Sequence, residues 1–176
     1  MSPGAGDRPR RVGATHPDAA AGLGALWTAV TRAGGAVGFA TGAPAEAVRA
    51  AAAEAVEDVR AGRLVMLATG PEQAPVGTVF LRRATGAVRA HRADLLRLMV
   101  HPDRQGRGLG SALLDAAVAE ARELGLEQLL LSTRGGTALP DYYAARGWTP
   151  VGVWPGALRL AADDVRDEHW FQLRLG

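Results

Sequence analysis

The chain of 176 residues contains no cysteine. This absence excludes disulfide bonds, zinc sites built on thiolates and cysteine nucleophiles. Lysine is absent too, so all 20 basic residues are arginine, and they are spread along the whole chain with a net charge of only +2. A nucleic-acid-binding surface needs basic residues clustered on one face. The even spread does not indicate such a cluster, so we predict no nucleic-acid partner.

Long apolar runs are also missing. No stretch of about 18 or more apolar residues exists, so no segment is predicted to span a membrane. The first residues, MSPGAGDRPRRVG, lack the apolar stretch that follows the charges of a secretory signal. We therefore expect a cytoplasmic protein without a membrane partner. We expect a flexible N-terminal tail at residues 1–8, and the length of the chain predicts one domain at residues 9–176.

Candidate metal ligands are sparse. The four histidines do not lie at metal-ligand spacing to one another, and no group of Asp and Glu residues compensates. They are His16, His91, His101 and His169. We therefore predict no metal site.

Glycine marks the predicted ends of four helices, because the residue after a helix often adopts the left-handed conformation that glycine favours. The predicted helices cover residues 17–33, 44–62, 108–124 and 138–146, and they end at Gly34, Gly62, Gly125 and Gly147.

Runs rich in Val, Leu, Phe and Trp between these helices predict strands. The first two runs are separated by the turn PEQAP and should form a hairpin. The order of elements, with helices first, then successive strands, then strands alternating with helices, predicts an α+β (mixed α/β) fold. The predicted strands cover residues 63–69, 75–83, 94–101, 127–133, 148–154 and 168–175, with a further short strand at 9–14.

Residues 101–114, HPDRQGRGLGSALL, connect a predicted strand to a predicted helix. The first N–H groups of a helix have no partner inside the helix and lie at the positive end of its dipole. A Ser, Thr, Asp or Asn usually caps them, but glycines precede this helix. The bare backbone can surround an anion closely, and Arg104 and Arg107 add positive charge. We interpret the loop as a phosphate or pyrophosphate site; the alternative is a tight turn without a ligand.

Two common phosphate-binding motifs do not fit this loop. The Walker motif needs a lysine after its last glycine, and the chain has none. The dinucleotide motif Gly-x-Gly-x-x-Gly would begin at Gly106, but it meets Ser111 in place of its third glycine. It also needs an acidic residue at the end of the next strand, which ends LLLSTR.

The pattern Gln-x-x-Gly-x-Gly at Gln105, Gly108 and Gly110 resembles the pyrophosphate motif of the GNAT superfamily of acyl-CoA-dependent N-acetyltransferases. LMVHPDRQGRGLGSALL is similar to the strand, loop and third helix of that family. DYYAARGW is similar to its later Tyr-x-x-x-Gly-aromatic element, and the order of elements matches from about residue 10 onward. Two shorter stretches, GGAVGF and ADLLRLMV, resemble the tabtoxin-resistance branch of the family.

The resemblance implies a central mixed, mostly antiparallel sheet of about six or seven strands flanked by about four helices. It implies acetyl-CoA as co-substrate, with a main-chain amide near Val100 stabilising the charge that develops on the thioester oxygen. The residues that it places around acetyl-CoA are Leu98, Met99, Val100, Arg104, Gln105, Gly106, Arg107, Gly108, Leu109, Gly110, Ser111 and Tyr143.

The same resemblance implies two catalytic residues. Tyr143, four residues before Gly147, corresponds to the acid that protonates the departing sulfur, and a phenol with a reference pKa of ~10 suits that role. The alternative is that it packs on the edge of its helix. Asp94, where many relatives carry a glutamate, is the predicted base, acting directly or through a water. His101 has a reference pKa near neutrality, but its place beside the loop indicates a structural role.

The resemblance also implies that two segments, 34–44 and 155–169, form the walls of the acceptor site. The second carries four carboxylates, which would either attract a cationic amine or form a solvated face: Asp163, Asp164, Asp167 and Glu168. Ser132 stands where the tabtoxin-resistance proteins have a carboxylate, so their substrates are not carried over. The residues predicted to contact the acceptor are Trp27, Phe39, Asp94, Ser132 and Trp154.

The predicted activity is acetyl transfer from acetyl-CoA to the primary amine of a small molecule, such as an antibiotic, a toxin or an amino-acid-like compound, by direct attack in a ternary complex. The alternatives are acetylation of a protein N-terminus or lysine, and a non-catalytic acyl-CoA-binding regulatory domain. The last predicted strand, 168–175, alternates well enough to lie at a sheet edge or to pair across a homodimer.

Overall fold

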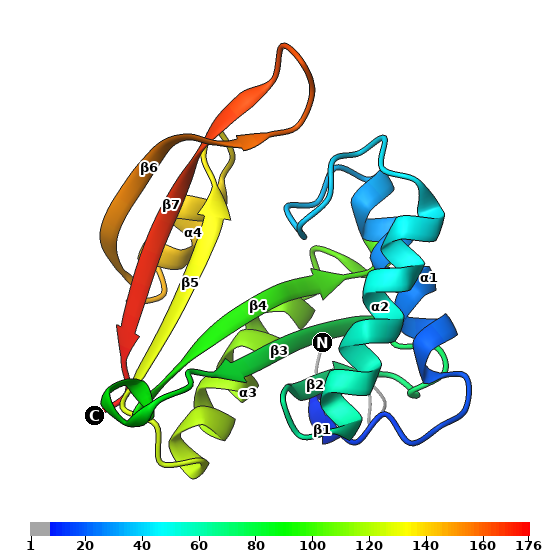
Figure 1. Ribbon diagram of the computed structural model, residues 1–176, viewed down its shortest axis with the longest axis horizontal. Coiled ribbons are helices and arrows are strands. Elements are labelled where there is room, and N and C mark those ends of the chain that lie inside the picture. Colours follow the sequence, from blue (N-terminus) through cyan, green and yellow to red (C-terminus); the bar gives the residue numbers. More distant parts are fainter. Residues whose placement is uncertain (1–7) are drawn as a thin grey trace.

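A computed structural model of the chain describes residues 8–176 (Figure 1). The predicted N-terminal tail at 1–8 therefore lies, apart from its last residue, outside the described residues. The helices are α1 (Ala19–Arg32), α2 (Ala45–Arg60), α3 (Leu109–Glu123) and α4 (Leu139–Ala144), with short 3-10 helices at Ala87–Arg89 and Pro102–Arg104. The strands are β1 (Arg10–Val12), β2 (Val65–Thr69), β3 (Gly77–Arg83), β4 (Arg92–Val100), β5 (Gln128–Arg134), β6 (Thr149–Arg159) and β7 (Val165–Arg174).

The seven strands form one sheet in the order β1-β2-β3-β4-β5-β7-β6. Only β4 and β5 are parallel, and every other neighbouring pair is antiparallel. The predicted hairpin of the second and third strands is present. The mixed, mostly antiparallel sheet and the α+β class are therefore confirmed.

Helices cover both faces of the sheet, and β2 shows this most clearly. All five of its residues are buried, because alternate side chains point to opposite faces. Met66 and Ala68 belong to the apolar core beneath α1 and α2, whereas Val65 and Leu67 belong to the core beneath α3. Within residues 8–176, no helix is long and apolar enough to cross a membrane.

The parallel strands β4 and β5 pair only along their first halves. Their pairing ends at Asp94 opposite Leu130. Beyond that point β4 stays with β3 as far as Val100, and β5 stays with β7 as far as Arg134. The two strands therefore diverge, as Figure 1 shows, and the sheet opens at its centre.

A β-bulge interrupts β4 at this opening. Thr78 pairs with Met99 and Phe80 pairs with Leu96, so Arg97 and Leu98 together face the single residue between their partners. Arg97 has a φ of 50°, in the left-handed region that residues other than glycine seldom adopt. A bulge of this kind shifts the alternation of side chains along the strand.

The end of the chain differs from the prediction in two ways. The last strand, β7, lies between β5 and β6 and is not at the edge; β6 is the edge strand. The predicted connection at 155–169 is mostly a β-hairpin, since β6 continues to Arg159 and β7 begins at Val165. Cross-strand pairing that the sequence does not reveal extends both strands, and the hairpin projects beyond the body of the sheet (Figure 1).

Candidate active site

The glycine-rich loop leaves the first turn of α3 open. The residue before the helix is Gly108, with a φ of 80°, and no side chain caps the helix. Gly106 has a φ of 72°, and a Cβ atom added to either glycine would meet nothing within 4 Å. The amides of the first turn lack acceptors inside the helix. The loop therefore presents free N–H groups and the positive end of a dipole to an open space, which is the arrangement that binds anions.

Gln105 ties this loop to the end of β4. Its side-chain amide donates to the carbonyl oxygen of Val100 at 3.0 Å. The next amide, that of His101, donates to Val76 at 2.9 Å on the β3 side. Because successive backbone groups of a strand point in opposite directions, the N–H of Val100 faces away from β3, into the opening. His101 lies outside both cavities described below; its Nδ1 accepts from the N–H of Asp103 at 3.3 Å.

A cavity of about 620 Å³ lies beside the loop, and we refer to it as the loop arm. It lies between the C-terminal half of β4, the start of α3 and α4. Its lining includes nine of the twelve residues predicted to contact acetyl-CoA: Leu98, Val100, Gln105, Gly106, Gly108, Leu109, Gly110, Ser111 and Tyr143. The other three do not line it. Met99 is 1% exposed and packs in the core under α1 and α2, and Arg104 and Arg107 lie outside the cavity.

Tyr143 reaches the loop arm from α4 but is only 7% exposed. Its ring packs edge-on against Trp148 and at a tilt against Phe171. Burial raises the pKa of its phenol to about 12; the nearby Tyr142 acts in the same direction and Arg146 opposes both. The hydroxyl therefore stays protonated through the physiological range and can donate a proton but not accept one.

A second group, on α4 and in the turn that follows it, was missed by the sequence analysis. The guanidinium of Arg146 lies 3.7 Å from the ring centroid of Tyr142 and donates to the hydroxyl of Ser111 at 2.8 Å. The Tyr142 hydroxyl lies 3.5 Å from the same Ser111 oxygen. These contacts bring a cation and a phenol to the start of α3. The only sequence signal for them is the pair of adjacent tyrosines before Gly147.

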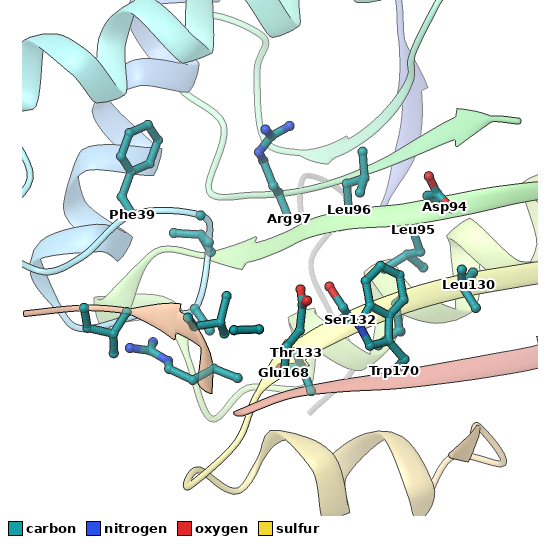
Figure 2. A pocket seen from close by; sticks show the side chains of 18 of the residues that line it. Phe39, Asp94, Leu95, Leu96, Arg97, Leu130, Ser132, Thr133, Glu168 and Trp170 are labelled. Carbon is teal, nitrogen blue, oxygen red and sulfur yellow. The ribbon is translucent and has the colours of Figure 1, made fainter. Parts of the chain in front are cut away.

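A second cavity of about 450 Å³ lies between the α1–α2 connection and the β6–β7 hairpin, and we refer to it as the hairpin arm (Figure 2). Asp94 lies in its wall. One carboxylate oxygen accepts from Arg82 at 3.0 Å, and the other has no partner among the described residues. Figure 2 shows Asp94 and Arg97 leaving β4 on the same side, with Ser132 and Glu168 projecting from β5 and β7 toward the same space.

The two arms form one continuous cleft. Both are lined by the divergent halves of β4 and β5 and by the segment that follows α1. The shared residues are Ala36, Val37, Leu95, Arg97, Leu131, Ser132, Thr133 and Arg134. The cleft therefore bends at the point where the sheet opens, with Tyr143 in one arm and Asp94 in the other.

Two of the residues predicted to contact the acceptor lie elsewhere. Trp27 is fully buried and lines neither arm; its indole N–H donates to the carbonyl of Val37 at 3.0 Å, and its ring packs edge-on against Phe39. Trp154 is 63% exposed on the edge strand and also lines neither arm. Phe39, Asp94 and Ser132 do line the hairpin arm. Trp27 thus supports the wall of the arm from behind.

The predicted run of four carboxylates does not face the cleft as a group. Asp164 pairs with Arg166 near the hairpin turn, and Asp167 accepts from the N–H of Gly156 at 2.9 Å. Asp163 is exposed in the turn, and Glu168 is the one member that lines an arm. The hairpin uses most of these charges for its own structure, so the run does not form the cationic-amine site that it suggested.

Sequence analysis missed the arginines of the hairpin arm and its second large aromatic residue. Arg82, Arg97, Arg134 and Arg159 line the arm, as does Trp170. In the part of the chain that the structure describes, no group of three or more His, Asp or Glu side chains is arranged to hold a metal ion. The chemistry available in the cleft is therefore that of protons, charges and main-chain donors.

Comparison with known families decides the identification. The family model described as the acetyltransferase (GNAT) family matches residues 39–148, which is more than half of the chain. The chain belongs to the GNAT acetyltransferase family. The matched part of this acetyltransferase includes the glycine-rich loop, Asp94 and Tyr143. It therefore contributes residues to both arms of the cleft.

Solved structures share the fold at low identity. A ribosomal-protein-alanine N-acetyltransferase from Brucella melitensis has a TM-score of 0.75 and 20% identity, covering 95% of this chain and 99% of its own. An acetyltransferase-like protein from Salmonella typhimurium, yncA, solved with its cofactor acetyl-CoA, has a TM-score of 0.74 and 17% identity over 96% and 93%. A structure named for phosphinothricin N-acetylation has a TM-score of 0.74 and 17% identity over 96% and 98%. At these identities the likeness supports the fold of the acetyltransferase and not its acceptor.

Proposed function

We propose that the acetyltransferase transfers an acetyl group from acetyl-CoA to the primary amine of a small molecule in a ternary complex. One observation carries the proposal: β4 and β5 separate beyond Asp94, so that a single cleft joins an anion-binding loop to a polar second arm. When bound, acetyl-CoA supplies an acyl group activated as a thioester. A structural neighbour was solved with acetyl-CoA, which supports the choice of acyl donor.

The residues of the loop arm fit a diphosphate. The open amides at Leu109, Gly110 and Ser111 and the space beside Gly106 and Gly108 would hold its negative charge. The N–H of Val100, directed into the opening, is the main-chain donor best placed for the thioester oxygen. A donor fixed in advance at that point stabilises negative charge as it develops, which is a major source of catalysis in acyl transfer.

Tyr143 would provide the proton for the departing sulfur. Its phenol stays protonated because burial holds its pKa at about 12. The same burial disfavours negative charge on a neighbouring sulfur and so raises the sulfur's affinity for a proton. Because burial also makes the phenol a weaker acid, its effects on the two groups oppose each other, and Tyr143 can give up its proton only as negative charge builds up on the sulfur.

Asp94 would accept the proton of the attacking amine. An amine is nucleophilic only when it is neutral, so a base is needed on the acceptor side of the cleft. The free carboxylate oxygen of Asp94 lies in the hairpin arm, while Arg82 holds the other oxygen. The acid and the base are thus in different arms, on opposite sides of the point where the arms meet.

The walls of the hairpin arm favour a small acceptor. Residues 36–40 bound it on one side and residues 157–160 of the hairpin on the other. Its volume of about 450 Å³ lies in the usual range for small-molecule pockets. A protein N-terminus would need a groove between these segments. A peptide in the assay below distinguishes the two acceptors.

The test is release of free CoA from acetyl-CoA in the presence of a panel of small primary amines and one unstructured peptide. We expect release that depends on both enzyme and amine, with an N-acetylated product of the expected mass. Enzyme without amine controls for thioester hydrolysis. Binding of acetyl-CoA with no product from any acceptor would contradict the proposal and favour a regulatory acyl-CoA-binding domain.

A further inference from the structure

The hairpin arm carries more positive than negative charge. Four guanidinium groups line it against two carboxylates, which leaves a net charge of +2. Arg82 and Asp94 pair with each other, and Glu168 lies opposite Arg134 in the register of β5 and β7. Arg159 donates to a carbonyl within its own hairpin turn. Two of the four cations, Arg97 and Arg159, therefore have no carboxylate partner in the arm, and Arg97 is the one that also makes no hydrogen bond to another described residue.

Arg97 is half-buried and forms no direct ion pair with another described residue. Its guanidinium lies 4.6 Å from the ring centroid of Trp27, and among the described residues it meets no carboxylate and no hydrogen-bond acceptor. Burial lowers its pKa, the nearby Arg82 acts in the same direction, and the carboxylate of Asp58 on α2 opposes both. A guanidinium has five N–H donors, so a cation held against an aromatic face in this way favours an anionic ligand that satisfies them.

The backbone of β4 is distorted where it presents this side chain. In a regular strand, residues 94 and 97 would point to opposite faces of the sheet. The bulge, with its positive φ at Arg97, brings both side chains to the same face, as Figure 2 shows. Strained backbone of this kind persists mainly at functional sites. The bulge therefore places an unpaired cation beside the predicted base.

Arg97 also lies at the junction of the two arms, since it lines both. The attacking amine must reach the acyl carbon at this junction. An anionic group held by Arg97 would therefore be only a few bonds from that amine. The wall of the same arm also includes the apolar residues Phe39, Leu96 and Trp170. They would accommodate an apolar side chain of the acceptor.

We infer that the acceptor is an α-amino acid, or an amine with an equally close acidic group, whose carboxylate binds the guanidinium of Arg97. This inference rests on the proposed acetyl transfer. In the reaction the amino nitrogen forms a bond to the acetyl carbon, and the carbon–sulfur bond breaks. The amine loses a proton to Asp94 or water, and the sulfur takes a proton from Tyr143. The products are an N-acetyl amino acid and free CoA. Polyamines and other multiply charged cations are disfavoured by the net positive arm.

The first test compares matched acceptors on the wild-type enzyme. L-Phenylalanine, L-leucine and L-glutamate are each assayed beside the corresponding carboxamide, with phenethylamine and spermidine as acceptors that lack the acidic group. We expect kcat/KM for the acids to exceed that for their amides by about 10- to 100-fold, the effect of one charge-assisted contact. Equal or better use of the amides or of spermidine would overturn the inference and leave acetyl transfer intact.

The second test replaces the cation. Arg97→Gln should lower kcat/KM for the acids by about 10- to 100-fold, mainly through KM, and should leave the amides nearly unchanged. Arg97→Lys should recover part of the loss. Arg89→Gln, an exposed arginine outside both arms, is the matched control. A similar loss for acids and amides would indicate a structural role for Arg97 and would contradict the inference. The circular dichroism spectrum of each variant should match that of the wild type, which checks that the variant is folded.

A binding measurement separates this inference from the proposed function. If no amine is acetylated, acetyl transfer fails, but calorimetry can still detect L-phenylalanine or L-leucine binding to the CoA-saturated protein. Binding to the wild type that Arg97→Gln abolishes would support the acidic-group site. Absence of binding by any of the amino acids, or equal binding to both proteins, would overturn it.

Discussion

The two arms of the cleft differ in the groups that they offer to a ligand: main-chain amides in the loop arm and side chains in the hairpin arm. The loop arm presents main-chain amides of one short stretch, 105–111, beside the end of β4. The hairpin arm presents side chains from the α1–α2 connection, β4, β5 and the β6–β7 hairpin. A main-chain site tolerates almost any neighbouring side chain but needs glycine at particular positions. A side-chain site depends on each residue and on how distant elements meet.

This contrast explains how one arm can serve a constant acyl donor while the other serves a particular acceptor. Changes in the loop arm should alter binding of acetyl-CoA or the chemical step for every acceptor. Changes in the hairpin arm should alter the choice of acceptor and leave the acyl donor alone. The predictions that follow test this division.

The largest effect is expected for Tyr143→Phe. Losing a general acid should lower kcat by roughly 10²- to 10⁴-fold for every acceptor, while acetyl-CoA binds as before, because the ring and its packing remain. Steady-state kinetics and calorimetry check both parts. Tyr142→Phe is the matched control, since this tyrosine also lies on α4 and its hydroxyl makes only a long contact, 3.5 Å, with Ser111. Unchanged turnover in Tyr143→Phe would exclude this tyrosine as the acid.

The titration of Tyr143 provides a second test. Its pKa in the folded protein is about 12, against ~10 in an unfolded chain. The raised pKa means that burial of the neutral phenol stabilises the fold fully below about pH 10, and that this contribution is lost as pH rises toward 12. The total is about 2–3 kcal/mol in the free energy of unfolding. With no cysteine or lysine in the chain, few other side chains titrate in this window.

The measurement is the ultraviolet absorbance of tyrosinate as a function of pH, with the wild type compared with Tyr143→Phe. The difference between the two curves should have its midpoint near pH 12. Because Tyr143 stays protonated, its ionisation should cause no decrease in kcat as the pH is raised to about 10. A midpoint near 10 would mean that the phenol is exposed to water and that the account of its burial is wrong.

In the loop arm, Gly108→Asp should weaken acetyl-CoA binding by about 10- to 100-fold. The new carboxylate would occupy the open space beside the first-turn amides and repel a diphosphate. Gly125→Asp is the control, because that glycine also has a positive φ, 72°, and also has no atoms within 4 Å of an added Cβ. Calorimetry with acetyl-CoA checks the pair. Equal weakening in both variants would point to general strain rather than to loss of the anion site.

The smallest effects distinguish the two tryptophans near the hairpin arm. Trp27→Phe removes the hydrogen bond to Val37 and part of a buried ring, so it should lower the free energy of unfolding by about 1–3 kcal/mol and raise KM for the acceptor only. Trp154→Ala, on the exposed edge strand, should change stability by no more than about 0.5 kcal/mol. Denaturant unfolding measures both. A large effect of Trp154→Ala on KM for the acceptor would show that Trp154 contacts the acceptor, contrary to its position outside both arms.

The same contrast decides what the sequence alone could predict. The four helices were located because each ends near a glycine, and the loop before α3 was interpreted correctly as lacking a side-chain cap, since both features are local. Arg97 could not be predicted as part of the site, because alternation along β4 places it on the wrong face and only the bulge reverses this. The interior position of β7 depends on pairing with β5 and β6, about which its own sequence carries no information.

For acidic and aromatic residues, the sequence predicted least well which side chains face the cleft. Trp27 and Trp154 were both predicted to contact the acceptor, yet one is fully buried and the other is 63% exposed. The sequence did not distinguish Asp164 and Asp167 from Glu168, but contacts within the β6–β7 hairpin engage the first two and leave Glu168 facing the cleft. Which member of such a group faces a cavity depends on the register between strands.

Thermal unfolding of the purified protein with acetyl-CoA, ATP or NAD added separately tests the central claim most directly. A ligand at about 100 times its Kd adds roughly 2.7 kcal/mol to the free energy of unfolding, which for a domain of this size raises Tm by about 5–10 °C. We predict such a rise with acetyl-CoA alone. A rise with ATP or NAD alone, or with none of the three, would contradict the assignment of the glycine-rich loop and with it the roles proposed for Tyr143 and Asp94.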